Sequence, residues 1–521
     1  MNGLVALLCV AALAFGIARW TRIPEIPLLV AAGFGLRLAS DGAGYNVPED
    51  SLFSVIELGL AILVFSAGID LTPRRLQGRV RPILSVGLWQ FSVLGLVGVA
   101  LALSLGYSVE TALYLGCALS ASSTLVVVRN LQRSQRLFEP FGRLVLGVLL
   151  LQDVLIVGFL VVLENLGSGA AGLLLAAARV GLLAAFALVL HRFVVPFVAR
   201  RLSLDDEERL LFALGTLFLF IYLAVLLEVS FIVGGFLAGF ALSAFPMNGL
   251  VRGMLGSLSS FFLALFFIGI GFFCVFPPAI LWLHALLFAG ALVLVTVTLV
   301  AWLAERHGLS ARNALQSGTL LSQTSEFSLL VMLAGLGAGQ IGEEVFSMFV
   351  LLTVATMALT PLIAGERFVQ RLLKLHPQAG KGSGRPFEQS GHTALIGFDQ
   401  TAPTMLRLFG QAGVPVVVVD EDPGVIRRLD AEGIAFVEGD AGSPEVLAQA
   451  NLRNARVVLA SLRRSGDLRQ LLEQTRDSGN LVLIRTFAPD DRQFVSQYEG
   501  VVAIDTVEAT VKAFERWLEK S

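Results

Sequence analysis

The sequence predicts a polytopic α-helical membrane protein that ends in a soluble α/β domain. Of its 521 residues, 55% are hydrophobic and only 15% are charged, and the mean hydropathy is +0.78. An ordinary soluble domain carries about 25% charged residues, so we expect most of this chain to lie in a lipid bilayer. After His392 the sequence becomes rich in Asp, Glu and Arg, as in a soluble protein. The net charge of −2 averages these two unlike parts and therefore indicates no class of partner.

Thirteen apolar stretches are candidates for transmembrane helices, which need about 20 residues each. They cover approximately residues 2–18, 25–38, 52–69, 81–104, 110–129, 141–163, 170–191, 208–226, 229–246, 256–274, 279–303, 313–336 and 344–364. The first stretch lacks a basic flank before it, and Arg19 and Arg22 follow it in place of a small-residue cleavage site. We therefore expect it to be a transmembrane helix and not a signal peptide.

Alternate loops between these spans differ in charge. One set holds the arginines Arg19, Arg22, Arg74, Arg75, Arg79, Arg133, Arg136, Arg200, Arg201, Arg209, Arg252, Arg306, Arg312, Arg367 and Arg371. The other set is acidic and has no Lys or Arg apart from Arg37, at the edge of the second span. Lys and Arg accumulate on the cytoplasmic side of a membrane. The pattern predicts an odd number of spans in the inner (cytoplasmic) membrane, with the N-terminus outside and the C-terminal domain in the cytoplasm.

Two spans contain polar interruptions at matching places. Residues 119–124 (LSASST) interrupt the fifth span and residues 322–328 (SQTSEFS) the twelfth, each the penultimate span of a six-span block. Paired interruptions indicate an inverted-repeat transporter with its site near the bilayer midplane. Broken helices expose half-helix ends and free backbone groups that can face an ion. The alternative is that these Ser and Thr residues only allow close helix packing.

Asp153 lies in the middle of the otherwise apolar sixth span. An acid at that depth costs at least about 2.5 kcal/mol and usually serves ion or proton traffic. Ionised Asp153 can hold a cation and protonated Asp153 cannot, so a cation and a proton would compete for it. Because its neighbour Gln152 is neutral, we expect electroneutral one-for-one exchange. The oxygen ligands available suit potassium or sodium, and the sequence alone does not separate these two ions.

Two other functions remain open at this point. The first is a ligand-gated cation channel or efflux system with the same fold and no strict coupling. In the second, the C-terminal domain senses a nucleotide and thereby controls ion flow through the membrane part, which acts as a valve.

The C-terminal region alternates strand and helix patterns. We expect a transmembrane domain over residues 1–366, a linker over 367–391 and an α/β domain over 392–521. Expected strands cover residues 392–398, 415–420, 435–438, 455–460 and 481–485, and expected helices cover 403–412, 424–432 and 444–450. This alternation predicts a doubly wound, Rossmann-like parallel sheet of about five or six strands.

The turn after the first of these strands carries an imperfect dinucleotide fingerprint. Gly397 occupies its first glycine position, but Asp399 stands at the second, where the backbone must let a pyrophosphate approach. Asp420 ends the next strand, at the spacing of a ribose ligand. Three outcomes remain open: intact dinucleotide binding, binding of a mononucleotide or altered ligand, and a ligand-free dimerisation or regulatory module. Nothing in the domain predicts the substrate site of an enzyme, and nothing predicts a nucleic-acid partner.

Six stretches resemble the monovalent cation:proton antiporter-2 family. They are LVFSAGIDLTPRRL (63–76), LSASSTLVVVRNL (119–131), LLLQDVLIV (149–157), IVGGFLAGFALS (232–243), FFLALFFIGIGF (261–272) and LLSQTSEFSLLV (320–331). The likeness is greatest to the glutathione-gated potassium efflux (Kef-type) antiporters, and residues 392–521 resemble their potassium-conductance-regulator (TrkA-N-like) domain. Many relatives carry a lysine in the span before the second break, where this chain has no Lys or Arg and the position falls near Thr296.

The resemblance implies a sodium/proton-antiporter inverted-repeat fold with about 13 spans and two broken helices. It further implies a homodimer in the bilayer that exchanges a cation, potassium rather than sodium, for protons by alternating access. An ancillary regulatory subunit would be a further partner. No cofactor is required, and a regulatory nucleotide, AMP or NAD(H), would bind the cytoplasmic domain.

The resemblance also assigns residues to two sites. The ion and proton site would comprise Asp153, Gln152, Ser122, Ser123, Thr124, Gln323, Ser325 and Glu326, with Asp153 as the ligand of K⁺ or Na⁺. The nucleotide pocket would comprise Gly397, Asp420, Asp440 and Arg485. Two roles are open for Glu326: it tunes or pairs with the ion site, or it closes the broken helix by accepting backbone N–H bonds.

Overall fold

The computed structural model divides the chain into two compact units. One comprises Met1–Ala304 and Leu315–Phe368, and the other comprises Glu305–Ala314 and Val369–Ser521. The structure describes residues 2–21, 25–43, 49–71, 80–133, 136–137, 139–201, 204–245, 249–375, 387–399, 401–462, 465–476, 478–486, 492, 494–498 and 500–505. Residues 376–386 of the predicted linker lie outside the described residues.

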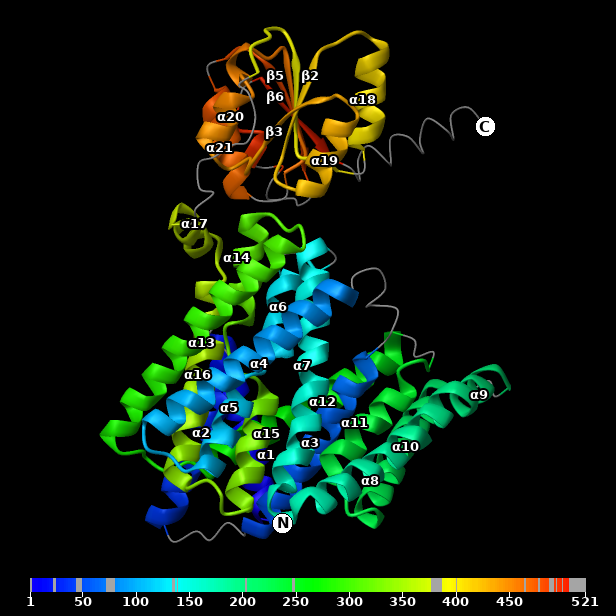
Figure 1. Cartoon of the computed structure of the whole chain (residues 1–521), viewed down its shortest axis with the longest axis vertical. Helices are drawn as coiled ribbons and strands as arrows, with labels where there is room; N and C mark the ends of the chain where they lie inside the picture. The colour runs from blue at the N-terminus through cyan, green and yellow to red at the C-terminus, as the bar shows by residue number, and fades with distance from the viewer. Residues whose placement is uncertain are drawn as a thin grey trace. The chain divides into compact units, whose positions relative to one another are not determined.

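All regular secondary structure that the structure describes in the first unit is helical (Figure 1). The helices as far as the second unit are α1 (Asn2–Thr21), α2 (Glu25–Ala43), α3 (Glu49–Asp70), α4 (Val80–Ser104), α5 (Val109–Leu119), α6 (Thr124–Arg133), α7 (Pro140–Glu164), η2 (Leu166–Ser168), α8 (Gly169–Val189), η3 (Leu190–Val194), α9 (Val195–Arg201), α10 (Asp206–Leu226), α11 (Phe231–Leu242), α12 (Gly249–Phe272), α13 (Ala279–Arg306), α14 (Ala311–Leu321), α15 (Glu326–Gly337), α16 (Glu343–Ile363) and α17 (Glu366–Leu375). Within the described residues, nine helices are long and apolar enough to cross a membrane. A helix satisfies its own backbone hydrogen bonds, which lipid cannot do.

Each of the thirteen predicted spans coincides with a helix or with a broken pair of helices. The fifth span divides into α5 and α6, and the twelfth into α14 and α15, so both predicted interruptions are confirmed as helix breaks. The seventh span was predicted to end at residue 191, but the helical path continues through η3 and α9 to Arg201. The prediction was too short because His191 and Arg192 interrupt the apolar run in sequence, while the ring of His191 stacks on Phe240 at 5.3 Å between centroids.

The packing of these helices defines two bundles. In the first, α12 packs on α2 and α3, α11 packs on α3, α8 and α10, and α1 packs on α2. We call these seven helices the scaffold bundle. In the second, α4 packs on α5 and α7, and α15 packs on α5, α7 and α16. We call α4 to α7, α15 and α16 the site bundle, because it contains Asp153, both halves of the first broken helix and the second half of the other.

Glycines bring the scaffold helices into close contact. A Cβ atom on Gly33 of α2 would overlap the carbonyl oxygen of Ile268 on α12, and one on Gly239 of α11 would overlap that of Phe65 on α3. Small residues at such crossings are how helices associate in lipid, where no hydrophobic force drives them together. The scaffold bundle is therefore held by backbone-to-backbone packing.

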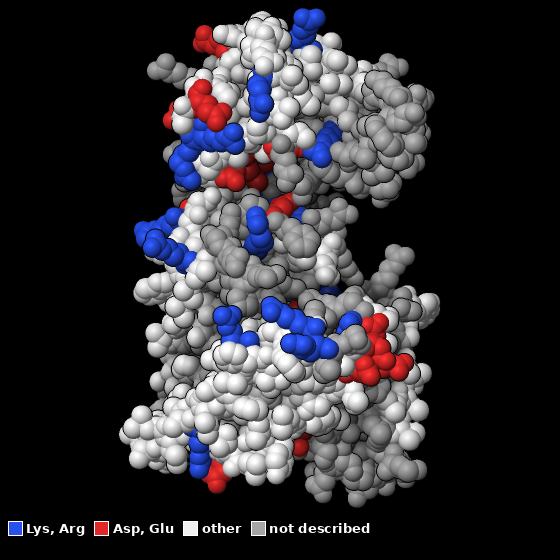
Figure 2. All heavy atoms as spheres, turned by 90° about the vertical axis from the view of Figure 1, so that its right-hand side faces the viewer, with Lys and Arg blue, Asp and Glu red and all other residues white. Residues whose placement is uncertain are grey.

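The surface of the helical unit agrees with a place in the bilayer. On the face shown in Figure 2, a broad belt of this unit carries almost no charge, and Lys and Arg gather in a row along one edge of the belt. Exposed apolar side chains such as Leu96, Leu182, Phe218 and Leu286 project from its helices. A belt of this kind is expected where a protein faces lipid tails.

The second unit contains a six-stranded sheet in which every strand pairing is parallel. Its strands are β1 (Thr393–Ile396), β2 (Val416–Asp420), β3 (Ala435–Glu438), β4 (Val457–Ala460), β5 (Leu481–Thr486) and β6 (Val501–Asp505), in the spatial order β3-β2-β1-β4-β5-β6. This is the order of the doubly wound dinucleotide-binding fold. The predicted α/β class and all five predicted strands are confirmed, and β6 is an addition.

Helices cover both faces of the sheet. They are α18 (Ala402–Gln411), α19 (Pro423–Ala431), α20 (Pro444–Gln449), η4 (Leu452–Asn454) and α21 (Ser465–Thr475). Figure 1 shows α18 and α19 on one side of the strands and α20 and α21 on the other. Successive residues of β1 alternate between them: Leu395 joins the apolar core with Leu429 of α19, and Ala394 and Ile396 join the core with Leu447 of α20. The carboxyl end of β1 therefore meets the start of α18, where a ligand loop is expected.

Candidate functional site

Asp153 lies in the middle of α7, and only 1% of its surface is exposed. Its neighbour Gln152 is fully buried. Consecutive residues of a helix point about 100° apart, so the two side chains meet different helices. Asp153 turns to α6, where the Thr124 hydroxyl donates to its Oδ2 at 3.2 Å. The Gln152 amide nitrogen donates to Gln90 on α4.

The first helix break wraps around these two side chains. The Ser122 N–H donates to Gln152 Oε1 at 3.1 Å, so the neutral neighbour of the acid satisfies a backbone group that the break exposes. The Ser122 hydroxyl donates to the Leu321 carbonyl at 2.7 Å. That carbonyl belongs to the last residue of α14, so one serine joins the first break to the second. Thr124 begins α6, and its place at that helix end aims its hydroxyl at Asp153.

The second break is closed by its own side chains and by α16. Ser325 caps α15: its hydroxyl accepts the Phe327 N–H at 3.1 Å, and its N–H donates to the Ser328 hydroxyl at 3.1 Å. This reciprocal arrangement is a capping box. The Thr324 hydroxyl lies 3.0 Å from that of Thr353 and 3.2 Å from that of Thr356, both on α16.

Glu326 lies between the starts of two half-helices. The Leu125 N–H in the first turn of α6, its own N–H in the first turn of α15 and the Ser123 hydroxyl lie close enough to its carboxylate to stabilise its charge. Helix N-termini carry a partial positive charge that an acid stabilises. This position is compatible with the predicted closure of a broken helix. Glu326 is also near enough to Asp153 for their charges to interact.

Three buried oxygen atoms of the predicted ion site accept no hydrogen bond from any residue that the structure describes. They are Asp153 Oδ1, Gln323 Oε1 and Glu326 Oε2. Nearly all buried polar atoms in proteins have a hydrogen-bond partner, and hard cations are held by carboxylate and carbonyl oxygens. Gln323 Nε2 donates to the Leu320 carbonyl at 3.3 Å, which leaves its oxygen as the free end of the amide.

All eight predicted site residues thus lie at the two breaks or on the facing turn of α7. Hydrogen bonds link Ser122 to Gln152 and Thr124 to Asp153 directly. Ser123 and Ser325 serve mainly as caps, since their hydroxyls accept the backbone N–H groups of Val126 and Phe327. The Thr296 position, where relatives carry lysine, is fully buried, and its hydroxyl has no partner among the described residues.

Sequence reasoning missed three residues that support this site: Gln90, Thr353 and Thr356. Gln90 is fully buried in α4 and bonds Gln152. The two threonines are one helical turn apart on α16 and hold Thr324. The sequence did contain a signal for each of them, because a polar residue inside an apolar span needs a hydrogen-bond partner. It did not indicate which residue the partner is, since that depends on how the helices pack.

In the cytoplasmic domain, Asp399 occupies the centre of the predicted nucleotide loop. Gly397 has a φ of +86°, which suits glycine, and it turns the chain from β1 into this loop. Asp399 Oδ1 accepts the Thr401 N–H at 2.8 Å and the Ala402 N–H at 3.2 Å at the start of α18. Its Oδ2 accepts the Ser461 hydroxyl at 2.7 Å and a guanidinium N–H of Arg485.

These contacts lower the pKa of Asp399. Burial alone would raise that pKa, but hydrogen bonds from Thr401 and Ser461 and the nearby Arg485 charge outweigh it. The carboxylate is therefore a bound anion at a helix N-terminus, the place where a ligand phosphate binds in this fold. A nucleotide phosphate does not fit the residues present, because its expected donors already hold Asp399.

Asp420 ends β2 as predicted, and both of its carboxylate oxygens are engaged. Oδ2 accepts the Phe398 N–H at 2.6 Å and Oδ1 accepts the Asp422 N–H at 2.8 Å. Burial raises the pKa of Asp420 to about 6 although these two hydrogen bonds oppose the shift. Of the other two predicted pocket residues, Arg485 pairs with Asp399, and Asp440 Oδ1 accepts the Gly442 N–H at 2.9 Å.

Comparisons with known proteins agree with both folds. The glutathione-regulated potassium-efflux system protein KefC of Cronobacter sakazakii is 28% identical over 454 residues, which is 83% of this chain and 70% of that protein. KefC of Salmonella heidelberg is 28% identical over 504 residues, or 93% of this chain and 79% of that protein. The sodium proton antiporter MjNhaP1 of Methanocaldococcus jannaschii has the same transmembrane fold, with a TM-score of 0.55 and 16% identity over 71% of this chain and 97% of that one.

Two family models match the chain in sequence order. Residues 393–488 match the TrkA-N domain. Residues 4–365 match the model described as "Sodium/hydrogen exchanger, transmembrane", which accounts for more than half of the chain. The function class follows from this match together with the antiporter fold: cation:proton exchange in a multi-pass membrane protein with a C-terminal TrkA-N domain. The chain belongs to the sodium/hydrogen exchanger family.

Proposed function

We propose that this protein exchanges potassium for protons, one for one, with Asp153 as the group that binds each in turn. The observation that carries the proposal is the buried carboxylate of Asp153, which lies beside a neutral Gln152 and faces the first helix break. The named activity of the KefC relatives, potassium efflux, supports potassium over sodium as the cation.

The exchange follows from competition at one carboxylate. In the ionised state, Asp153 Oδ1 offers a free ligand oxygen, and Gln323 Oε1 and Glu326 Oε2 are further buried oxygens without a donor in the described part of the chain. Cation release lets a proton neutralise Asp153 before the site turns to the other side of the membrane. Because Gln152 adds no charge, the cation and the proton each carry one charge across, and the net movement of charge is zero.

The family match favours this exchanger over the gated channel that the sequence left open. A coupled carrier needs a site that faces one side at a time. Asp153 is only 1% exposed and is held by Thr124 at the start of α6, as an enclosed site requires. Coupling also predicts that cation flux stops when the acid is neutralised, whereas a pore can continue to conduct.

We further propose the finer features that the sequence suggests. The exchanger works as a homodimer in the inner (cytoplasmic) membrane, with its N-terminus outside, and it accepts an ancillary regulatory subunit. Its α/β domain lies in the cytoplasm and regulates exchange. Since Asp399 holds the donors that a phosphate would need, this regulation proceeds in the wild-type protein without a bound phosphate in that loop.

One assay tests the central proposal. Purified protein in proteoliposomes with an internal pH dye should respond to an added cation by proton movement, and the response should be larger for potassium and rubidium than for sodium and lithium. A flux of potassium that does not move protons would overturn exchange. A response that is equal for sodium would overturn the choice of cation but not the mechanism.

A further inference from the structure

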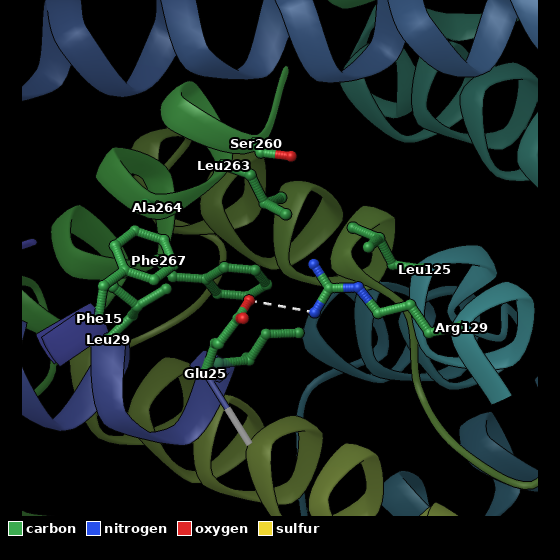
Figure 3. Close-up of a pocket in the computed structure, with 10 residues that line it drawn as sticks. Phe15, Glu25, Leu29, Leu125, Arg129, Ser260, Leu263, Ala264 and Phe267 are labelled. Carbon is green, nitrogen blue, oxygen red and sulfur yellow. Dashed lines mark hydrogen bonds and ion pairs between the residues drawn. The ribbon is translucent and has the colours of Figure 1, made fainter. Parts of the chain in front are cut away.

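A small pocket lies between the two helix bundles, near the predicted ion site. Its volume is about 40 Å³, which exceeds the ~10–15 Å³ that one water molecule needs. Figure 3 shows the side chains that line it and an ion pair between Glu25 and Arg129 across it. The guanidinium Nη1 of Arg129 lies 3.1 Å from Glu25 Oε2.

The two sides of this pocket belong to different bundles. The scaffold bundle contributes Phe15 of α1, Glu25 of α2 and Phe267 of α12. The site bundle contributes Leu125 and Arg129, both on α6. The Glu25–Arg129 ion pair therefore joins a helix of the scaffold to a half-helix of the site bundle.

The same half-helix leads directly to the ion site. Leu125, in the wall of the pocket, follows Thr124, whose hydroxyl donates to Asp153. The Leu125 N–H also meets Glu326. The pocket wall therefore includes the sequence neighbour of Thr124, the residue that hydrogen-bonds the carboxylate we propose as the exchanging group.

We propose that the Glu25–Arg129 ion pair is a latch that holds the two bundles together at this pocket, and that a cation on its way to Asp153 passes this pair. The proposal rests on the proposed exchange at Asp153. Alternating access moves one bundle against the other, so a contact that joins the bundles must break during each cycle. The side chains of Arg129 and Glu25 are 47% and 42% exposed. An ion pair this exposed is weak and can open at every turnover.

The charges of the pair also act on the arriving cation. An unpaired Arg129 repels a cation that passes it, and an unpaired Glu25 attracts one. The two single neutralisations should therefore have opposite effects on the cation concentration at half-maximal rate. A pair with only a structural role would change stability in the same direction for both variants and leave this concentration unchanged.

The test uses full-length protein in proteoliposomes with potassium as the substrate. Glu25→Gln should raise the half-saturating potassium concentration about two- to five-fold, and Arg129→Gln should lower it by a similar factor. The charge-swapped variant Glu25→Arg with Arg129→Glu should restore it to within two-fold of the wild type. Equal shifts in the same direction for both single variants, or no shift in either, would overturn the latch.

A second measurement tests closure itself. Glu25→Cys and Arg129→Cys are combined in a protein in which the natural Cys9, Cys117 and Cys274 are replaced by serine. A bismaleimide that links the two positions should stop exchange, and a monofunctional maleimide should not. Full exchange by the cross-linked protein would overturn the latch. Wild-type protein in the same vesicles separates the two ideas, because its failure to exchange would count against Asp153 exchange and not against the latch.

Discussion

The hydroxyl of Thr124 donates a hydrogen bond to Asp153 Oδ2 at 3.2 Å, and so joins the first residue of a half-helix to the middle of α7. A continuous helix over this span would place its backbone groups in its own ladder. Because the helix breaks over Ser120–Ser123, the first residue of α6 lies opposite the acid, and its side chain can reach the carboxylate.

Asp153→Asn should abolish potassium-driven proton movement. The amide keeps the size of the side chain but neither ionises nor takes up a proton near neutral pH. The variant therefore loses both cation binding and proton binding. Dequenching of a pH dye in proteoliposomes measures the response, which we expect to fall at least 100-fold. Thr298→Val, on the exposed face of α13 and away from the site, is the matched control for assembly. Exchange that persists in Asp153→Asn would refute the carboxylate mechanism.

Gln152→Glu should make exchange electrogenic. A second carboxylate beside Asp153 lets two charges be neutralised per cation, so net charge crosses the membrane in each cycle. Currents on a solid-supported membrane after a potassium jump are the measurement: we expect none for the wild type and a transient current for the variant. Gln152→Asn, which shortens the side chain without adding charge, should remain silent. If the wild type itself produces current, one-for-one exchange is wrong.

Asp399→Gly should create a phosphate site in the cytoplasmic domain. The substitution frees the Thr401 and Ala402 N–H groups, the Ser461 hydroxyl and Arg485, all of which Asp399 now engages. Hydrogen bonds to a charged phosphate are stronger than those between neutral groups. We therefore expect the variant to bind AMP or NADH at least about ten-fold more tightly than the wild type does. Calorimetry on a fragment of residues 387–521 measures it.

Asp399→Asn provides the control for that prediction, because it removes the charge but leaves a side chain in the loop. Thermal unfolding of each fragment checks that the domain still folds, since loss of contacts at a helix start can cost about 0.5–2 kcal/mol. Micromolar binding of NADH by the wild-type fragment would show that Asp399 does not fill the site.

Asp420 should make the cytoplasmic domain less stable as the pH rises from 4 to 6. Its pKa in the folded domain is about 6, above its ordinary value of 3.8. The folded domain therefore binds the proton more tightly than the unfolded chain, and this contribution is present below pH 4 and lost as the pH passes 6. Urea unfolding of the 387–521 fragment at pH 4, 5, 6 and 7 gives the free energy of unfolding. The difference in free energy of unfolding between Asp420→Asn and the wild type should shrink towards pH 4 and change little above pH 7. A difference that is constant across this pH range would contradict the raised pKa of Asp420.

Much of the fold was predictable because it depends on local composition. Long apolar runs predict helices in lipid, and polar clusters such as Ser122–Thr124 predict where those helices break. The alternating apolar strands of the C-terminal domain predict a parallel sheet in the same way. β6 was not identified individually, because Val501–Asp505 is one short strand without a clear pattern of its own.

The sequence by itself determined that Asp153 is a costly acid within a helix, that Gln152 is its neutral neighbour, and that Asp399 replaces a glycine. Only the tertiary structure decided what these side chains contact. Gln90 reaches Gln152 across 62 residues of sequence, Glu326 meets the start of α6, and Arg485 pairs with Asp399 across 86 residues. Such contacts depend on how helices and strands pack, and composition and spacing carry no record of which distant side chain will lie opposite a buried charge.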